Sequence, residues 1–490
     1  MDHAHRIGES SRRNFLKGAC AAAVLAAVSP PLAEATDAKA VELIVGRRTI
    51  EVGGRAAGVY GIRQPNGRQG IEAVAGSRFR VRLSNDLTSP TLVHWHGLAP
   101  PTDQDGVPEL SQPALAAGHS YNYDFPLNRS GTFWMHSHVG LQEQQLLAAP
   151  LIVPAPDDTR ADEQSVVIML HDFSFRAPEE IFSQLRQRGG GHGSMSMDSG
   201  NMGGMSMGQA SEGQGMPRTM AMDLNDVEYD AYLANDRTLA DPDVVRVAPG
   251  GRLRLRIING SAATNFHIDL GQLKGQLIAV DGDSILSIDG SRFELAVAQR
   301  ADIRLRLPRG SGAYPIIALR EGERQRTGIV LATKGARITR IESEAAQAAA
   351  PLGLDLERRL RARNPLSAKP PSRVIPVALT GNMASYQWSI NGQVYGQNRP
   401  LMVRQNERVE MSIVNKTMMS HPMHLHGHHF QIVEIQGERF AGAMRDTFLV
   451  PPMANLKIAF DADNPGRWAF HCHNLYHMQA GMMTEVRYAA

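Results

Sequence analysis

The sequence predicts an all-β protein made of three consecutive β-sandwich domains. Its 490 residues suggest about three domains of roughly 150 residues each. Its 46 glycines and 28 prolines suit short strands separated by turns. A pattern of one turn followed by one alternating strand also recurs three times without gaps. The three copies are Ala75–Asn85, Pro249–Asn259 and Gln405–Asn415.

A second repeat occurs after the first and third copies and is missing after the middle one. Gly131-Thr-Phe-Trp-Met-His-Ser-His138 aligns with Gly466-Arg-Trp-Ala-Phe-His-Cys-His473. Where the first copy has His94-Trp-His96, the middle copy has His267-Ile-Asp269, and residues 312–317 contain no His-x-His. We therefore expect metal chemistry between the first and third domains. The second domain would act as a spacer, with His267 in a structural role.

Residues 1–35 have the features of a twin-arginine export signal. Arg12-Arg13 precedes an apolar run over residues 18–28, and Ala33-Glu-Ala35 suits cleavage after Ala35. The apolar run is well short of the ~20 residues needed to span a bilayer, so we expect no membrane anchor. These features predict export by the twin-arginine machinery and a periplasmic location.

The cysteine count agrees with an exported protein, and the net charge offers no sign of a nucleic-acid partner. Cys20 would leave with the signal and does not fit a lipoprotein motif, because Lys17 precedes it. Cys472 then remains alone, which excludes an intramolecular disulfide and favours a thiol protected by a bound metal. Removing residues 1–35 lowers the formal net charge from +2 to +1, which offers no electrostatic argument for nucleic-acid binding.

The remaining chain divides into three domains and a linker. We expect a first domain over residues 36–156, a second over 157–340, a linker over 341–375 and a third over 376–490. Helix should be sparse, with one short segment over 178–187 and some helical tendency over 345–363.

A methionine-rich insertion over residues 192–222 interrupts the second domain. Glycine, serine and glutamine surround its methionines, so the segment cannot form a core and should be a mobile loop. Thioethers favour Cu(I), which makes the insertion a candidate copper-binding segment. The alternative is a flexible insertion without specific binding. The candidate ligands include Met195, Met197, Met202, Met205 and Met207.

The run His471-Cys472-His473-Asn-Leu-Tyr-His477, with Met482 close behind, is the strongest functional signal. It combines a thiolate, imidazoles and a thioether, which is a soft ligand set typical of copper. Side chains alternate along a strand, so His471 and His473 should point to one face and Cys472 to the other. One strand would then contact two metal centres. With an earlier imidazole, Cys472, His477 and Met482 could form a one-electron copper site.

Three further clusters supply histidines in pairs at i, i+2. They are His94-Trp-His96, His136-Ser-His138 and His421-Pro-Met-His424-Leu-His426. Each i, i+2 pair places two rings on the same face of a strand. If His421 and His477 belong to the Cys472 site, eight imidazoles remain in four pairs, which suits a copper cluster. A single pair could be two structural histidines, but four pairs beside a His-Cys-His centre favour metal binding.

These motifs, in this order and over nearly the whole mature chain, closely resemble those of the multicopper oxidases, which include laccases, ascorbate oxidase and bacterial cuprous oxidases. The resemblance implies three cupredoxin-like Greek-key domains and four coppers per chain. It assigns His421, Cys472, His477 and axial Met482 to a type 1 copper, and His94 and His424 to a type 2 copper. It assigns the type 3 pair to His96, His136, His138, His426, His471 and His473.

Residues outside the ligand set match the resemblance less evenly. Asp105 lies where similar oxidases carry an acid that assists proton delivery, although Asp105-Gly106 could also be an ordinary turn. Met478 replaces a glutamate that many bacterial cuprous oxidases have, which leaves the second proton route open. Met419 matches a substrate-copper methionine and Met418 precedes it, with core packing as the alternative. Thr417 replaces the acid expected near them.

We expect a monomer, and the resemblance implies that it passes electrons one at a time from a donor to dioxygen and releases water. Cu(I) is the first candidate donor, with phenols or amines also accepted and a role in copper tolerance. The second hypothesis is a laccase-like oxidase of organic donors, and the third is a methionine-rich protein that sequesters copper. A two-domain copper nitrite reductase would lack the paired histidines, and a copper-free relative would lack the ligands.

Overall fold

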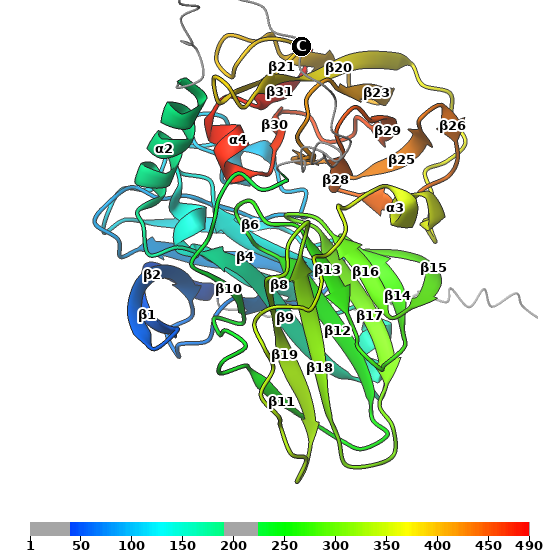
Figure 1. Ribbon diagram of the computed structural model, residues 1–490. Coiled ribbons are helices and arrows are strands. Elements are labelled where there is room, and N and C mark those ends of the chain that lie inside the picture. The colour runs from blue at the N-terminus through cyan, green and yellow to red at the C-terminus, as the bar shows by residue number, and fades with distance from the viewer. Residues whose placement is uncertain (1–39, 191–223, 490) are drawn as a thin grey trace, which may run out of the picture. The chain divides into compact units, whose positions relative to one another are not determined.

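The computed structural model describes residues 40–190 and 224–489. Strands dominate these residues and pair into six sheets (Figure 1), as expected for an all-β protein. The predicted export signal with Cys20, and the methionine-rich insertion with Met195, Met197, Met202, Met205 and Met207, lie outside the described residues.

Residues 41–153 form two four-stranded sheets. The first has the order β2-β1-β4-β6, made of Arg55–Arg63, Val41–Val52, Arg78–Asn85 and Ser120–Pro126. The second has the order β3-β8-β7-β5, made of Ile71–Glu72, Ala148–Val153, Gly131–Ser137 and Val93–His94. Apolar side chains of both sheets share one core, which includes Leu43, Phe79, Trp95 and Phe133.

Residues 164–333 form two larger sheets. One has the order β10-β9-β12-β17-β14-β15, made of Ala231–Ala234, Gln164–Phe173, Arg252–Asn259, Arg300–Arg306, Gly275–Val280 and Asp283–Gly290. The other has the order β11-β19-β18-β13-β16, made of Val244–Val247, Arg326–Thr333, Ala313–Arg320, Phe266–Asp269 and Arg292–Leu295. Their shared core includes Leu255, Phe266 and Ile303.

Residues 373–488 form the last two sheets. One has the order β21-β20-β23-β29-β25-β26, made of Gln387–Ile390, Arg373–Asn382, Arg408–Asn415, Asn455–Asp461, Phe430–Ile435 and Glu438–Arg439, and β27 (Met444–Arg445) also pairs with β25. The other has the order β22-β31-β30-β24-β28, made of Leu401–Val403, Met483–Tyr488, Arg467–Cys472, His421–Leu425 and Thr447–Val450. Their core includes Trp388, Met411 and Trp468.

The three copies of the first sequence repeat take the same structure. Each copy ends in a strand, β4, β12 or β23, whose last residue is a buried asparagine: Asn85, Asn259 and Asn415. In each copy the asparagine Oδ1 accepts the backbone N–H of the second following residue, and its Nδ2 donates to a carbonyl later in the chain. A buried amide must satisfy its polar atoms, so this residue closes the same corner of each sandwich.

Helices are short in the described part of the chain. They are α1 (Pro156–Arg160), α2 (Pro178–Gly190), α3 (Asp355–Arg359) and α4 (Leu475–Gln479), with 3-10 turns η1 (Thr102–Gln104) and η2 (Gln142–Gln145). The predicted helix over 178–187 is confirmed as α2. Its Ile181 and Leu185, four residues apart, pack on the third core, which is the one formed by the sheets of residues 373–488. Among the described residues, every helix is too short or too polar to cross a membrane.

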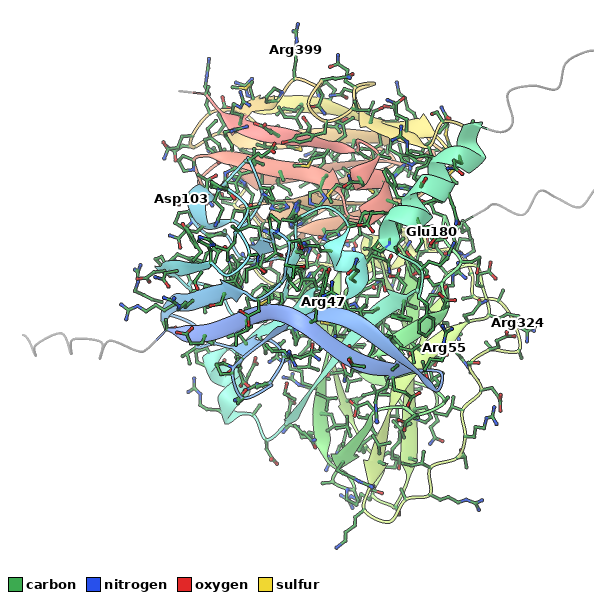
Figure 2. All side chains as sticks on the ribbon, turned by 90° about the vertical axis from the view of Figure 1, so that its left-hand side faces the viewer. Arg47, Arg55, Asp103, Glu180, Arg324 and Arg399 are labelled. Atoms are coloured by element: carbon green, nitrogen blue, oxygen red, sulfur yellow. The ribbon has the colours of Figure 1, made fainter. Side chains whose placement is uncertain are left out.

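Two exposed arginines lie on loops outside the sheets. Figure 2 shows Arg324 and Arg399 pointing away from the ribbon, and both are exposed. Histidines show the opposite pattern, because those of the predicted ligand set are buried. That burial requires a specific partner for each imidazole.

Candidate metal centres

Strand β30 presents Cys472 to one centre and its two neighbours to another, as the alternation of side chains predicts. The Cys472 Sγ lies 3.7 Å from Nδ1 of His421 and 3.7 Å from Nδ1 of His477. The two Nδ1 atoms are 3.1 Å apart. These three side chains and Met482 are fully buried in the third core. Two imidazoles and one thiol therefore converge in a dry environment, and the Met482 carbonyl accepts the Cys472 backbone N–H at 3.0 Å.

Local structure holds His421 and His477 in this arrangement. His421 begins β24, and the pairing of Met423 with Cys472 places β24 beside β30. His477 lies on α4, whose N-cap Asn474 accepts the backbone N–H groups of Tyr476 and His477. This cap fixes the first turn of a helix that is too short to form alone.

The outer nitrogens of both imidazoles have polar neighbours. The Nε2 of His421 lies 2.7 Å from Thr417 Oγ1, at the position where the resemblance suggested an acid. The Nε2 of His477 lies 2.7 Å from Asp226 Oδ2, which also accepts the Tyr386 hydroxyl. In both rings Nδ1 is the nitrogen that faces the sulfur.

Eight histidines from four chain segments converge at the second centre. The first of each pair lies on a strand, β5, β7, β24 or β30, and the second lies at most two residues beyond the strand end. Ring centroids of neighbouring histidines are 3.8 to 5.9 Å apart. Their exposed fractions are all 9% or less. The set is His94, His96, His136, His138, His424, His426, His471 and His473.

Hydrogen-bond acceptors determine which nitrogen of each ring faces inward. His94 Nδ1 donates to the Asp105 carbonyl at 2.8 Å, and His424 Nδ1 donates to the Asp446 carbonyl at 2.8 Å. A carbonyl only accepts, so in the neutral rings both Nε2 atoms carry lone pairs. These two Nε2 atoms lie 3.4 Å apart. Two facing lone pairs in a buried site repel each other unless a cation lies between them.

The same pattern recurs at the next pair of rings. His426 Nδ1 lies 2.8 Å from Asp105 Oδ2, and His471 Nδ1 donates to the Cys472 carbonyl at 3.0 Å. Their Nε2 atoms then face each other at 3.0 Å. The donor set therefore fits bound metal, because second acceptors of this kind orient histidine ligands in metalloproteins.

The remaining four imidazoles each leave one buried nitrogen without a protein partner. His96 Nε2 lies 3.1 Å from Asp446 Oδ1 and leaves Nδ1 unpartnered. His136 Nδ1 lies 2.8 Å from Glu143 Oε2 and leaves Nε2 unpartnered. The Nε2 atoms of His138 and His473 are also unpartnered. Unsatisfied nitrogens in a buried cluster are costly, and metal coordination would satisfy them.

Burial favours the neutral form of seven cluster imidazoles. Desolvation and the surrounding rings hold the pKa values of His96, His136, His138, His424, His426 and His473 well below the usual range. Desolvation lowers the pKa of His471 to about 4. Neutral imidazole is the metal-binding form, so no proton has to leave at neutral pH. Burial raises the pKa of the Cys472 thiol, so that ligand must lose its proton to a bound metal.

Other residues singled out in the sequence take varied positions. Asp105 is 1% exposed at the cluster, and its Oδ1 lies 3.3 Å from His94 Nδ1. Met419 is buried, whereas Met418 is 63% exposed. The Nε2 of His267 lies 2.8 Å from the Ala350 carbonyl, as a structural role predicts.

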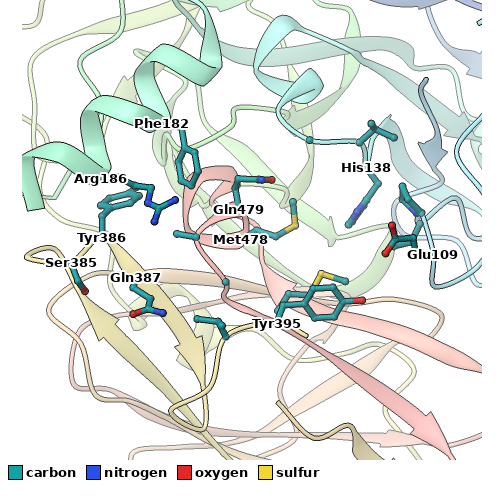
Figure 3. A pocket seen from close by; sticks show the side chains of 18 residues that line it. Glu109, His138, Phe182, Arg186, Ser385, Tyr386, Gln387, Tyr395, Met478 and Gln479 are labelled. Atoms are coloured by element: carbon teal, nitrogen blue, oxygen red, sulfur yellow. The ribbon is translucent and has the colours of Figure 1, made fainter. Parts of the chain in front are cut away.

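A cavity of about 690 Å³ is lined by His138 of the histidine cluster and by Met478, the residue after His477. Figure 3 shows Phe182, Arg186 and Tyr386 on one side, Glu109 and His138 on the other, and Met478 between them. Met478 is therefore a lining residue of the cavity, directly after His477 in the chain. The cavity offers room for a small donor molecule beside His138, a ligand candidate of the cluster.

The contacts of three carboxylates with candidate ligands were not predicted from the sequence. Glu143 contacts His136, Asp226 contacts His477 and Asp446 contacts His96. Glu143 follows His138 closely enough to be noticed, but nothing in its spacing separates it from a polar turn. Asp226 and Asp446 carry no local signal, because their partners lie far away in the chain.

Comparison with known proteins agrees with this geometry. Models of the multicopper oxidase family match residues 49–158, 165–336 and 368–490. The chain is 32% identical over 436 residues to multicopper oxidase MmcO of Mycobacterium tuberculosis, covering 85% of this chain and 81% of that protein. It is 26% identical to copper resistance protein A of Escherichia coli, covering 98% and 99%. A laccase structure from Botrytis aclada superposes with a TM-score of 0.73 at 21% identity, covering 91% and 87%.

Proposed function

Since this chain belongs to the multicopper oxidase family and is an oxidoreductase that uses copper and dioxygen, we propose that Cu(I) is its principal donor and copper tolerance its role. Two features support this donor. The chain is similar over nearly its whole length to a copper resistance protein. It also carries thioethers in the methionine-rich insertion and at exposed Met418, and thioethers favour Cu(I).

We assign four coppers to the two centres. His421, Cys472, His477 and Met482 would hold the type 1 copper, and His94 and His424 the type 2 copper. His96, His136, His138, His426, His471 and His473 would hold the type 3 pair. When bound, these coppers accept single electrons from the donor and pass four to dioxygen, which becomes water.

The observation that carries this assignment is the shared strand β30. Cys472 lies 3.7 Å from the two imidazoles of one centre, and its chain neighbours His471 and His473 belong to the other. The backbone therefore provides a covalent electron path between the centres. Burial of both centres excludes bulk water from the reacting region.

Asp105 is our candidate for proton delivery. Its Oδ2 lies 2.8 Å from His426 Nδ1 and its Oδ1 lies 3.3 Å from His94 Nδ1, so the carboxylate contacts two ligand candidates of the cluster. Asp105→Asn should lower the oxygen-uptake rate while copper content stays complete. Unchanged oxygen uptake would remove Asp105 from the mechanism.

The first test is a measurement on the purified mature protein. We expect about four coppers per chain, a blue thiolate-to-copper absorption and oxygen uptake with Cu(I). Copper without the blue absorption or oxygen uptake would refute the oxidase assignment.

The donor is tested by two variants of the insertion. Deleting residues 191–222 should lower Cu(I) turnover and copper tolerance, while oxidation of a phenol continues. A length-matched variant with Met195, Met197, Met202, Met205 and Met207 replaced by leucine separates loss of thioethers from loss of chain. Unchanged Cu(I) turnover and tolerance in both would reject Cu(I) as the insertion's ligand.

A laccase-like function is the second candidate, and the cavity beside Met478 favours it. Its volume of about 690 Å³ suits an organic donor, and Phe182 and Tyr386 supply aromatic surface. Under this alternative, phenol turnover exceeds Cu(I) turnover and the insertion variants change neither.

Copper sequestration is the third candidate, and Cys472→Ser distinguishes it. This change removes the thiolate between the centres and should abolish oxidase activity while leaving the methionines intact. Storage predicts unchanged copper tolerance in this variant, whereas catalysis predicts its loss.

We also propose the cellular context and domain boundaries expected from the sequence. The protein would be exported by the twin-arginine machinery, cleaved near Ala35, and act as a periplasmic monomer without a membrane anchor or nucleic-acid partner. The domains would span 36–156, 157–340 and 376–490, with a linker over 341–375. Mass spectrometry of the exported protein and light scattering would test cleavage and oligomeric state.

A further inference from the structure

The buried guanidinium of Arg300 lies at the junction of the three family-matched segments. Arg300 is fully buried and begins β17 in the ligand-free middle segment. A guanidinium has five N–H donors and cannot lose its charge, so burial requires five acceptors and an anion.

All five donors of Arg300 have acceptors. Nε donates to the Thr132 carbonyl at 3.2 Å, which belongs to the first segment. Nη1 donates to the Ala298 carbonyl and Nη2 to the Asp281 carbonyl, at 3.2 and 3.0 Å, within the middle segment. Both Nη atoms donate to the Asp446 carboxylate of the third segment.

Asp446 contacts the histidine cluster as well as Arg300. Its Oδ1 lies 3.1 Å from His96 Nε2 and accepts the Thr447 hydroxyl at 2.9 Å. Thr447 Oγ1 in turn lies 3.1 Å from His96 Nε2 and 3.2 Å from His424 Nδ1. Asp446 and Thr447 therefore contact two ligand candidates directly.

The middle segment holds residues 445–447 at further points. Asp281 Oδ2 accepts from Arg445 Nη1 at 3.1 Å and from the Thr447 backbone N–H at 3.4 Å. Gln299 Nε2 donates to the Thr447 carbonyl at 3.2 Å. The side chain of Asp446 is thus held in one orientation from a part of the chain that supplies no ligand candidate.

The local sequence leaves room for this ion pair. A Cβ on Gly97 would meet Arg300 Nη2 at 2.5 Å and Asp446 Oδ2 at 3.1 Å. The glycine directly after His96 therefore lets the Arg300–Asp446 pair approach the backbone of the candidate ligand.

We propose that Arg300 is a positioning residue for the type 3 centre: through Asp446 it fixes the ring orientation of His96, so that His96 Nδ1 faces the copper. The middle segment then contributes to the metal site as well as separating its neighbours. This inference rests on the proposed role of His96 as a ligand. Lysine cannot replace Arg300, because an ammonium lacks the planar fork that binds both carboxylate oxygens.

Arg256 provides a matched control for the structural cost of losing a buried arginine. It is 1% exposed and also joins the first and middle segments, through Thr132 Oγ1 at 3.0 Å and Asp302 Oδ2 at 3.1 Å. Its hydrogen-bond acceptors, which also include Ser165 and Asp158, contact none of the eight cluster histidines. Arg256→Met should lower the melting temperature and leave the copper spectra unchanged.

The experiment compares Arg300→Met, Arg300→Lys, Asp446→Asn and Arg256→Met as copper-loaded full chains. We measure copper per chain, near-ultraviolet absorption of the coupled type 3 pair, the blue absorption, melting temperature and oxygen uptake. In the three variants at Arg300 and Asp446, we expect loss of the near-ultraviolet band, retention of the blue absorption and about 10–100-fold slower oxygen uptake.

Two results would overturn the inference. One is a folded Arg300→Lys or Asp446→Asn protein with normal near-ultraviolet absorption and oxygen uptake. The other is an equal loss of the near-ultraviolet band in Arg256→Met, which would reduce Arg300 to general stability. If Arg300→Met does not fold, Asp446→Asn still decides, because it keeps the side-chain shape and removes the anion. A wild-type protein without type 3 absorption would refute the proposed function itself.

Discussion

At the scale of single residues, Gly97 shows how tightly the cluster is packed. Its φ of +91° lies in the left-handed region, and an added Cβ would come within 2.6 Å of Phe133 Cδ1 as well as meeting Arg300. Gly97→Ala should therefore lower the melting temperature and disturb the near-ultraviolet copper absorption, measured by thermal unfolding and spectroscopy.

Gly118 separates backbone strain from the clash. Its φ is +74°, and nothing lies within 4 Å of an added Cβ. Gly118→Ala should cost about 1–2 kcal/mol from the left-handed backbone alone and leave the copper spectra intact. Equal destabilisation by the two substitutions would mean that the contacts around Gly97 contribute nothing.

At the scale of secondary-structure elements, α4 depends on its cap to place His477. Asn474 Oδ1 accepts from Tyr476 N at 3.2 Å and from His477 N at 3.3 Å. Asn474→Ala should cost about 1 kcal/mol and weaken or shift the blue absorption, because the first turn carries a ligand candidate. Visible absorption and thermal melting of the copper-loaded protein measure both effects. Asn474→Asp keeps a capping oxygen and should preserve the absorption; an unchanged spectrum in Asn474→Ala would contradict this role.

At the scale of the whole molecule, copper should link the family-matched first and third segments. His94 and His424 come from these two segments, and their lone-pair nitrogens lie 3.4 Å apart. Removing copper with a chelator should lower the melting temperature, and adding it back should restore it. A metal present at 100 times its Kd stabilises the folded state by about 2.7 kcal/mol per site.

Cys472→Ser is the control for this copper linkage, because it disrupts one centre and keeps the eight clustered histidines. Calorimetry should show that it retains most of the copper-dependent stabilisation. Equal melting temperatures of the metal-free and copper-loaded wild-type protein would contradict a linking role for the metal.

The contacts that Arg48 and Gln69 make with Asp236 of the middle segment should depend on pH. Arg48 donates to both carboxylate oxygens at 2.7 and 2.9 Å, and Gln69 donates at 2.7 Å. Burial alone would raise the pKa of Asp236, but these contacts outweigh it and hold the pKa below its usual value. The carboxylate therefore stabilises the fold above the unfolded-state pKa of about 3.9, and this contribution is lost as the pH falls through the lower folded-state pKa.

Melting temperatures measured across this range should show the effect. The melting temperature of the wild type should exceed that of Asp236→Asn near neutral pH, and this difference should become smaller in acid. Glu72→Gln is the control, because the Arg68–Glu72 pair is more than half exposed and should contribute little. A constant difference between wild type and Asp236→Asn at every pH would exclude this carboxylate as the titrating group.

Much of the architecture could be predicted because it depends on local periodicity. The three repeats became β4, β12 and β23, each ending in a buried asparagine, and the helix over 178–187 became the start of α2. Alternation along a strand also separated Cys472 from His471 and His473, as the structure shows. Patterns of this kind require only the chain's own geometry.

The sequence by itself determined the metal-binding chemistry: the residue types, their i, i+2 spacing and the copies that carry them. Tertiary structure alone decided the partners that orient those ligands. His96 meets Asp446 across 350 residues of sequence, and the ligand-free middle segment reaches the cluster through Arg300. The physical reason is that a buried imidazole or guanidinium can be satisfied by any well-placed acceptor. Only the packing of the segments selects which acceptor is there.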